Sequence, residues 1–224
     1  MNTLRLRCPA KINLFLEVTG KRPDGYHNLK TLFAKLTLHD ALSVKKIHKS
    51  ATEIRLTIKN HTGMPLAADS SNLAVKAARV FMEAFNKPGG INMLLEKRIP
   101  LGAGLGGGSS DAAGVLRALH RLFRLKGKPG SNKKLMKLAA GLGADVPFFL
   151  KDETFCIGSG IGDKLSPVIT PGKLPYVLLA YPGSGVPTAK AYSALRLPRR
   201  KTLLTSLKSL RKLKFRLEHG DPLD

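Results

Sequence analysis

The chain has 224 residues, 43% of them apolar, which is enough for one large domain or for two small lobes with a substantial core. Its 38 lysines and arginines stand against 15 acidic residues, and the net charge of +23 would attract any polyanion, whether a nucleotide, a nucleic acid or an anionic membrane. With two cysteines, no signal-peptide core and no apolar run of the roughly 18 residues that a membrane span needs, we expect a cytoplasmic protein without disulfides.

The first segment that carries chemistry is Pro9-Ala-Lys-Ile-Asn13, which we expect to form a strand. Side chains two apart on a strand point the same way, so Lys11 and Asn13 share a face. A lysine among apolar neighbours is costly unless it meets an anion, and its expected counterpart is Asp145 in the glycine-rich turn Gly141–Pro147. A carboxylate beside a lysine stays ionised and can orient a substrate hydroxyl or accept its proton. Taken alone, Asp145 would equally fit a turn that stops a helix.

The segment Arg22-Pro-Asp-Gly-Tyr-His27 places an aromatic ring and an imidazole directly after a Pro-Asp-Gly turn. Tyr26 and His27 are suited to stack on a flat heterocycle or to hydrogen-bond to it. Either residue could equally serve packing.

Alternation of apolar and polar residues predicts half-buried strands near residues 36–44, 54–58 and 91–95. Between the last two, apolar residues at helical spacing predict a helix over 73–84, with Ser70 or Ser71 as its cap.

The most informative segment runs from Pro100 to Ala113, where five glycines in seven positions are followed by two serines and an apolar run at helical spacing. Glycines let the backbone approach a polyphosphate, and a helix that starts near Ser109 adds the positive end of its dipole. Gly108 stands where a P-loop needs lysine, and no acidic residue lies about 20 positions onward as a dinucleotide fold requires. The segment therefore predicts a phosphate loop of another kind, and a glycine-rich surface turn is the alternative.

The remaining elements complete an α+β pattern. The helix after the glycine loop should end before Gly127–Gly130, and Ser131 should cap a third helix that stops near Gly141. Strands are predicted at 154–157 and 176–180, the second of them buried on both faces because it is wholly apolar.

Near the C-terminus, leucines from Leu203 to Leu213 stand three or four apart among lysines and arginines. This spacing predicts a basic amphipathic helix docked by its leucine face, with a membrane or nucleic-acid contact as the alternative.

Four of these segments, in this order and at this rough spacing, resemble those of one family. They are Pro9-Ala-Lys-Ile-Asn-Leu14, Arg22-Pro-Asp-Gly-Tyr-His27, the glycine-rich Pro100–Ala113, and Leu142-Gly-Ala-Asp-Val-Pro-Phe-Phe149. From Pro9 to about Tyr192 the chain is similar to the 4-diphosphocytidyl-2-C-methyl-D-erythritol kinases, in the superfamily named for galactokinase, homoserine kinase, mevalonate kinase and phosphomevalonate kinase. The lysine and tyrosine-histidine segments favour this family over its relatives.

The resemblance implies a two-lobed α+β small-molecule kinase with its active site in the cleft between the lobes. An ATP-binding and catalytic lobe is expected at residues 1–160 and a substrate lobe at 161–224. The implied reaction is ATP-dependent phosphorylation, with Mg²⁺, of the 2-hydroxyl of the cytidine-diphosphate-linked methylerythritol in non-mevalonate isoprenoid synthesis.

The resemblance also implies roles for particular residues. Lys11 and Asp145 are the expected catalytic pair, and Asn13 is expected to position the substrate. The cytidine pocket is assigned to Tyr26, His27, Thr188 and Tyr192, and the surroundings of the adenine to Asn72 and Lys97. The ATP phosphates are assigned to Pro100, Gly102, Ala103, Gly104, Leu105, Gly106, Gly107, Gly108, Ser109 and Ser110, with Ser109 or Ser110 as a candidate contact of Mg²⁺.

Members of the family are expected to continue beyond residue 224 into a second glycine-rich motif, so we expect the substrate lobe to be incomplete here. Two alternatives stay open on the sequence. One is another small-molecule kinase of the superfamily, such as a mevalonate-pathway enzyme. The other is a basic nucleic-acid-binding protein built on a kinase scaffold.

Overall fold

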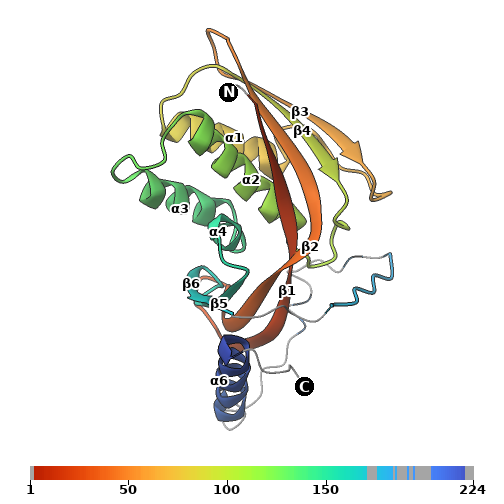
Figure 1. Cartoon of the computed structure of the whole chain (residues 1–224). Coiled ribbons are helices and arrows are strands. Elements are labelled where there is room, and N and C mark those ends of the chain that lie inside the picture. Colours follow the sequence, from red (N-terminus) through yellow and green to blue (C-terminus); the bar gives the residue numbers. More distant parts are fainter. Residues whose placement is uncertain are drawn as a thin grey trace. The chain divides into compact units, whose positions relative to one another are not determined.

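The computed structural model describes residues 3–170, 176–183, 185, 191, 194 and 203–219, with the backbone alone for 203–207. Figure 1 shows the predicted α+β fold, with strands and helices interspersed along the chain. Internal packing divides it into two compact units. Unit 1 comprises Met1–Ala10, Leu36–Leu101 and Leu105–Lys151, and unit 2 comprises Lys11–Lys35, Gly102–Gly104 and Asp152–Asp224. Both units are therefore discontinuous in sequence, and the division into lobes at residue 160 stays a prediction.

The sheet of unit 1 combines antiparallel and parallel pairing. Strand β2 (His27–Ile47) pairs antiparallel with β4 (Gly90–Lys97), and β1 (Thr3–Lys21) also pairs with β2. Strand β3 (Glu53–Asn60) runs parallel to β4 and lies at the edge. A parallel pair needs a crossover, and α1 (Leu73–Ala84) lies in the connection between these two strands. The strands and the helix predicted for this part of the chain are confirmed.

Four helices accompany this sheet among the described residues of unit 1. Helix α2 (Gly107–Leu122) is followed by α3 (Ser131–Leu142) and the short α4 (Val146–Leu150), and Figure 1 shows α1 and α2 side by side against one face of the strands. The contact with the sheet is close at Gly114 of α2. A Cβ there would lie 2.5 Å from the sulfur of Cys8, so the helix approaches the strands only because this position is glycine.

Unit 2 is built on the remaining parts of β1 and β2. Strand β5 (Phe155–Ser159) pairs antiparallel with β2 and with β6 (Lys164–Val168). Helix α6 (Leu203–His219) packs its buried Leu210 and Leu217 into a cluster with Leu32, Ala34, Phe155 and Val168. The expected docking of the basic helix through its leucine face is therefore confirmed. No described helix has both the length and the apolar composition that crossing a membrane requires.

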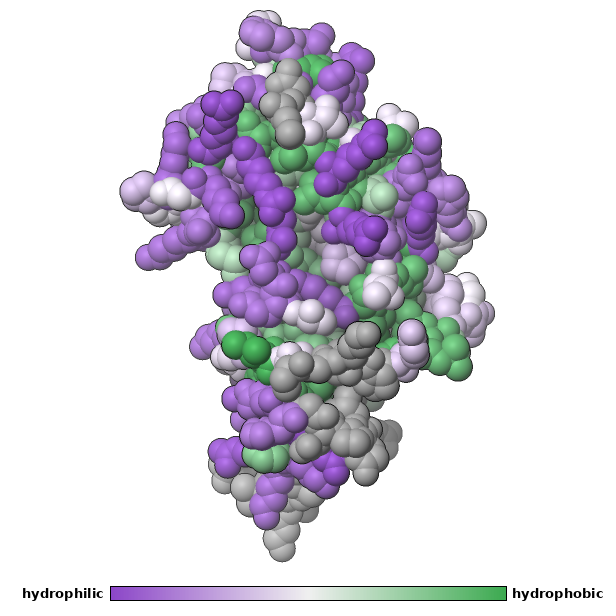
Figure 2. Space-filling view, viewed as in Figure 1, coloured by the Kyte–Doolittle hydropathy of each residue, from purple (hydrophilic) through white to green (hydrophobic). Residues whose placement is uncertain are grey.

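Polar side chains are prominent on one face of the molecule (Figure 2), in keeping with the composition. Hydrophilic side chains cover much of the face shown in Figure 2. On the described part of α6, Lys208, Arg211 and Lys212 are exposed, while Lys214 pairs with Glu218 at 3.5 Å.

Several local predictions were wrong. Tyr176–Ala180 forms no strand and is exposed, although its apolar composition predicted a strand buried on both faces. The cap of α1 is Asn72, whose side chain accepts a hydrogen bond from the backbone N–H of Ala74, and neither Ser70 nor Ser71 serves. Ser131 lies inside α3, where its hydroxyl donates to the carbonyls of Leu125 and Lys128, and Gly130 precedes the helix. Strand β6 and helix α4 were not predicted.

Candidate active-site residues

The glycine loop leads directly into α2. Gly102, Gly104 and Gly106 adopt φ values of 69°, 72° and 70°, a left-handed conformation that favours glycine. The helix begins at Gly107, two residues before the predicted start, and its first helical bond runs from the N–H of Ser110 to the carbonyl of Gly106 at 2.9 Å. The first turn contains no acidic residue and no side chain caps it. The amides of Gly107, Gly108 and Ser109, which precede that bond, have no acceptor within the helix, so this end can receive an anion.

Lys97, the last residue of β4, points into the interior of unit 1 and is only 1% exposed. Its ammonium donates to Oδ2 of Asp40 on β2 and, at 2.7 Å, to Oδ2 of Asp111 on α2. The other oxygen of Asp40 accepts from the backbone N–H groups of Arg98 and Ile99, at 2.6 and 2.9 Å. We call Asp40, Lys97 and Asp111 the buried triad. Since its ammonium is held by two carboxylates, Lys97 could contact an adenine only through its backbone, and its predicted role there stays a prediction.

The buried triad contains two carboxylates and one ammonium, and this imbalance of charge, together with burial, shifts the pKa values of Asp111 and Lys97. Burial raises the pKa of Asp111 to about 7, because the opposing charge of Lys97 only partly offsets the loss of water and the like charge of Asp40. Burial lowers the pKa of Lys97, but the two carboxylates outweigh it, so the net direction is upward. Cys8 lies nearby, and burial followed by the charges of Asp111 and Asp40 raises the pKa of its thiol, which makes it an inert core residue.

Asn72 serves the start of α1 with both ends of its amide. Its Oδ1 accepts from Ala74 at 3.0 Å, and its Nδ2 donates to the carbonyl of Ala67 at 2.7 Å. This local role accounts for an asparagine at the position, and its predicted place beside the adenine stays a prediction.

In unit 2, Lys11 and Asn13 lie side by side on β1 as predicted. The ammonium of Lys11 donates to Oδ1 of Asn13 at 2.8 Å, and it lies 5.4 Å from the ring centroid of Phe33. The amide of Asn13 donates to the hydroxyl of Thr31 at 2.6 Å, and that hydroxyl donates to the carbonyl of Phe15 at 2.7 Å. This series of hydrogen bonds fixes the side chain of Asn13 and, through it, the position of the buried Lys11.

The segment from Arg22 to Tyr26 forms the turn between β1 and β2. Arg22 pairs with Asp24 at 2.7 Å, Gly25 has a φ of 84°, and the N–H of Arg22 donates to the carbonyl of Tyr26. The ring of Tyr26 is 60% exposed, and His27 is the half-buried first residue of β2. An exposed ring on a tight turn is available to stack on a ligand.

Asp145 lies in unit 1, directly before α4, with a helical backbone conformation and a half-buried side chain that does not cap the helix. Helix α3 ends at Leu142 and Asp145 occupies the N-cap position of α4, so Asp145 does lie in a turn that stops a helix, but its side chain makes no capping hydrogen bond. Its pairing with Lys11 stays a prediction. Thr188 and Tyr192 lie outside the described residues.

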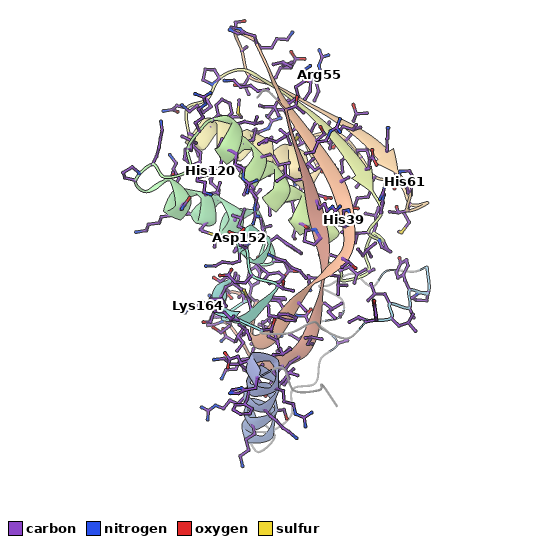
Figure 3. The ribbon with its side chains drawn as sticks, viewed as in Figure 1. His39, Arg55, His61, His120, Asp152 and Lys164 are labelled. Atoms are coloured by element: carbon purple, nitrogen blue, oxygen red, sulfur yellow. The ribbon has the colours of Figure 1, made fainter. Side chains whose placement is uncertain are left out.

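Metal-binding side chains do not gather in the described part of the chain, where no three His, Cys, Asp or Glu residues come together. Figure 3 shows His39 on β2, His61 after β3 and His120 on α2 lying well apart. Mg²⁺ bound with a nucleotide takes phosphate and water ligands and needs few from the protein. The Ser110 hydroxyl fits such a limited role, because its oxygen is buried and has no hydrogen-bond partner among the described groups.

Sequence reasoning missed Asp40, Asp111 and Thr31. Their partners lie 57, 14 and 18 positions away, so no local spacing identifies them. A buried lysine at the end of an alternating strand was the available signal for the buried triad, because such a group requires a carboxylate partner.

Solved structures similar to this chain include kinases and mevalonate diphosphate decarboxylases. A 4-(cytidine 5'-diphospho)-2C-methyl-D-erythritol kinase aligns with a TM-score of 0.71 and 37% identity, covering 97% of this chain and 72% of that one. A homoserine kinase from Cytophaga hutchinsonii aligns with a TM-score of 0.67 and 20% identity, covering 99% and 69%. A mevalonate diphosphate decarboxylase from Legionella pneumophila, 17% identical, shares the fold with a TM-score of 0.65. The family model described as GHMP kinases N terminal domain matches residues 72–153, which include α1, the glycine loop and α2. The fold and the glycine loop thus define a protein of the GHMP kinase class.

Curated relatives narrow this class further. Two proteins named 4-diphosphocytidyl-2-C-methyl-D-erythritol kinase, from Chlorobium chlorochromatii and Thermus thermophilus, are 44% and 45% identical over 82% and 84% of this chain. The chain belongs to the 4-diphosphocytidyl-2-C-methyl-D-erythritol kinase family, as its motifs predicted. It spans 60% and 61% of the length of these two relatives.

Proposed function

We propose that the protein transfers the γ-phosphoryl group of ATP to the 2-hydroxyl of 4-diphosphocytidyl-2-C-methyl-D-erythritol. The observation that carries the proposal is the start of α2, an acid-free first turn entered through the left-handed Gly106, in a chain that belongs to this kinase family. The names of its relatives support the identity of the acceptor. The geometry of the loop supports the binding of a phosphate-rich donor.

The residues from Pro100 to Ser110 would bind the ATP phosphates through backbone N–H groups, as the resemblance implies. Phosphoryl transfer develops charge on the phosphoryl oxygens, so oriented amides are well suited to stabilise it. Asn72 and the backbone of Lys97 would lie near the adenine. Mg²⁺ would neutralise charge on the phosphates when bound, with the hydroxyl of Ser109 or Ser110 as its candidate protein ligand.

Asp145 would orient the acceptor hydroxyl and take its proton as the oxygen forms a bond to the γ-phosphorus and the bond to the departing ADP breaks. The resemblance assigns Lys11 to the same step. The hydrogen bond from Lys11 to Asn13 supports this, because it holds the ammonium in one position before substrate arrives. Asn13 would thereby position the substrate both directly and through the lysine.

Tyr26 and His27 would bind the cytosine, together with Thr188 and Tyr192. The exposed ring of Tyr26 supports the first assignment, because a stacking face must be open in the free protein. An acceptor that carries cytidine distinguishes this kinase from those that act on homoserine or mevalonate.

Calorimetric titration with a non-hydrolysable ATP analogue and with cytidine diphosphate tests the proposal. The parent chain should bind both, and Gly106→Val should weaken the analogue selectively, because a branched side chain at a φ of 70° strains the loop. Equal loss of both ligands would indicate misfolding. Absence of analogue binding, together with steeply salt-dependent RNA binding, would favour the nucleic-acid alternative instead.

A further inference from the structure

The buried triad connects the strand that leads into the glycine loop with the helix that leaves it. Asp40 holds the N–H groups of Arg98 and Ile99, where the chain turns from β4 towards the loop. Lys97 joins Asp40 to Asp111, which lies one turn into α2. All these groups belong to unit 1, and the triad side chains are at most 4% exposed.

The first turn of α2 rests directly on this triad. A Cβ on Gly107 would lie 2.8 Å from the Lys97 ammonium nitrogen and 3.1 Å from Cγ2 of Ile99. The backbone of Gly107 does not have a left-handed φ, so the glycine is required by the closeness of the lysine and not by its own conformation. The neighbouring Gly108 has open space where its Cβ would be.

The triad cannot act on a phosphate simply as a positive charge. Its three groups carry one positive and two negative formal charges when all are ionised, and its lysine is buried beneath the helix turn. A cluster of this composition can instead fix geometry. Each member limits the orientation of the next, and hydrogen bonds shielded from water are exchanged rarely.

We propose that Lys97 is a positioning residue for the nucleotide, which acts with Asp40 and Asp111 to hold the amides at the start of α2 in the orientation that receives phosphates. This inference rests on the proposed function, since it assumes that those amides bind ATP. It adds a role for the Lys97 side chain that is separate from any contact with adenine.

Asparagine and alanine at position 111 separate positioning from general stability. Asp111→Asn retains an oxygen that can accept from Lys97, whereas Asp111→Ala removes the connection to α2. Lys97→Met breaks the triad at its centre but leaves two buried carboxylates without a counter-charge, so this variant is expected to be the least stable. The matched control is Ser131→Ala, which removes a buried hydroxyl with two hydrogen bonds at α3 of the same unit.

The experiment measures affinity for a non-hydrolysable ATP analogue and for cytidine diphosphate by calorimetry. It also measures hydrogen exchange of the amides from Gly106 to Ser110 without ligand. Asp111→Ala and Lys97→Met should weaken the analogue about 10-fold or more and speed exchange of these amides, with cytidine diphosphate affinity within about 2-fold of the parent. Asp111→Asn should stay within about 3-fold of the parent for the analogue. Ser131→Ala should lower the melting temperature without moving analogue affinity.

Parental analogue affinity and amide exchange in Asp111→Ala would overturn the positioning role. Equal weakening of both ligands in that variant would do the same, because the effect would then be one of stability. If Lys97→Met does not fold, the comparison of Asp111→Ala with Asp111→Asn decides whether the triad has the positioning role. If the parent itself fails to bind the analogue, the proposed function fails and the nucleotide part of this inference fails with it, while the exchange data still report whether the triad orders the turn.

Discussion

Alanine substitutions at two adjacent glycines, Gly107 and Gly108, should have opposite effects on stability. Both lie in the first turn of α2, and glycine to alanine in a helix stabilises by up to about 1 kcal/mol when space permits. At Gly108 no heavy atom lies within 4 Å of the new Cβ. At Gly107 the Cβ would meet the ammonium of Lys97 at 2.8 Å and Ile99 at 3.1 Å.

A flexible lysine could swing aside, but this one is held by Asp40 and Asp111. Forcing a methyl group into such a site costs about 1–3 kcal/mol, which exceeds the helical gain. The free energy of unfolding of Gly107→Ala should therefore lie about 1–3 kcal/mol below that of Gly108→Ala. For a chain of this size the difference corresponds to about 2–4 °C in melting temperature per kcal/mol.

Urea and thermal unfolding, followed by circular dichroism without nucleotide, measure this difference. Each variant serves as the control for the other, because helix propensity changes equally in both. If Gly107→Ala is as stable as Gly108→Ala, then the Lys97 side chain is not fixed beneath the turn, and the geometry assigned to the buried triad is wrong.

Three further predictions concern the site. Asp145→Asn should lower turnover by on the order of 100-fold or more while ATP-analogue binding is retained, because the carboxylate is proposed to act on the acceptor hydroxyl; near-normal turnover would contradict this proposed role. Tyr26→Ala should weaken cytidine diphosphate binding by roughly 1–3 kcal/mol without loss of stability, since the ring is exposed and would stack on the base; parental affinity in calorimetry would place the base elsewhere. Burial raises the pKa of Asp111 from 3.8 to about 7, so the folded chain binds this proton more tightly than the unfolded chain does. That contribution to the free energy of unfolding is complete below pH 3.8 and is lost as the pH rises through 7. Urea denaturation at a series of pH values should therefore show the free energy of unfolding declining between pH 4 and 7, and Asp111→Asn should lack this decline.

Local patterns predicted the elements that carry the site, because strands β3 and β4 and helices α1 and α2 have clear periodicity. The glycine loop was equally visible, since runs of glycine before a helix have few structural uses. Residues brought together by folding were not predictable in the same way. The partners of Lys97 come from β2 and α2, and only the topology places them together.

Composition also gave a wrong prediction where the burial of a segment depends on distant parts of the chain. Tyr176–Ala180 is apolar enough for a strand buried on both faces, yet it is exposed among the described residues. Hydrophobicity predicts that a segment should be covered, but it does not identify what covers it. Similarly, Asn72 took the capping role expected of its serine neighbours, because serine and asparagine both suit a cap and their order in the sequence alone cannot rank them.

The most direct measurement of the central claim is transfer of the labelled γ-phosphoryl group of ATP to 4-diphosphocytidyl-2-C-methyl-D-erythritol, with homoserine and mevalonate as competing acceptors and Asp145→Asn as the control chain. We expect label on the 2-hydroxyl of the cytidine substrate, little on the other acceptors, and a loss of on the order of 100-fold or more in the control. Preference for homoserine or mevalonate, or transfer that is unchanged in Asp145→Asn, would contradict the account.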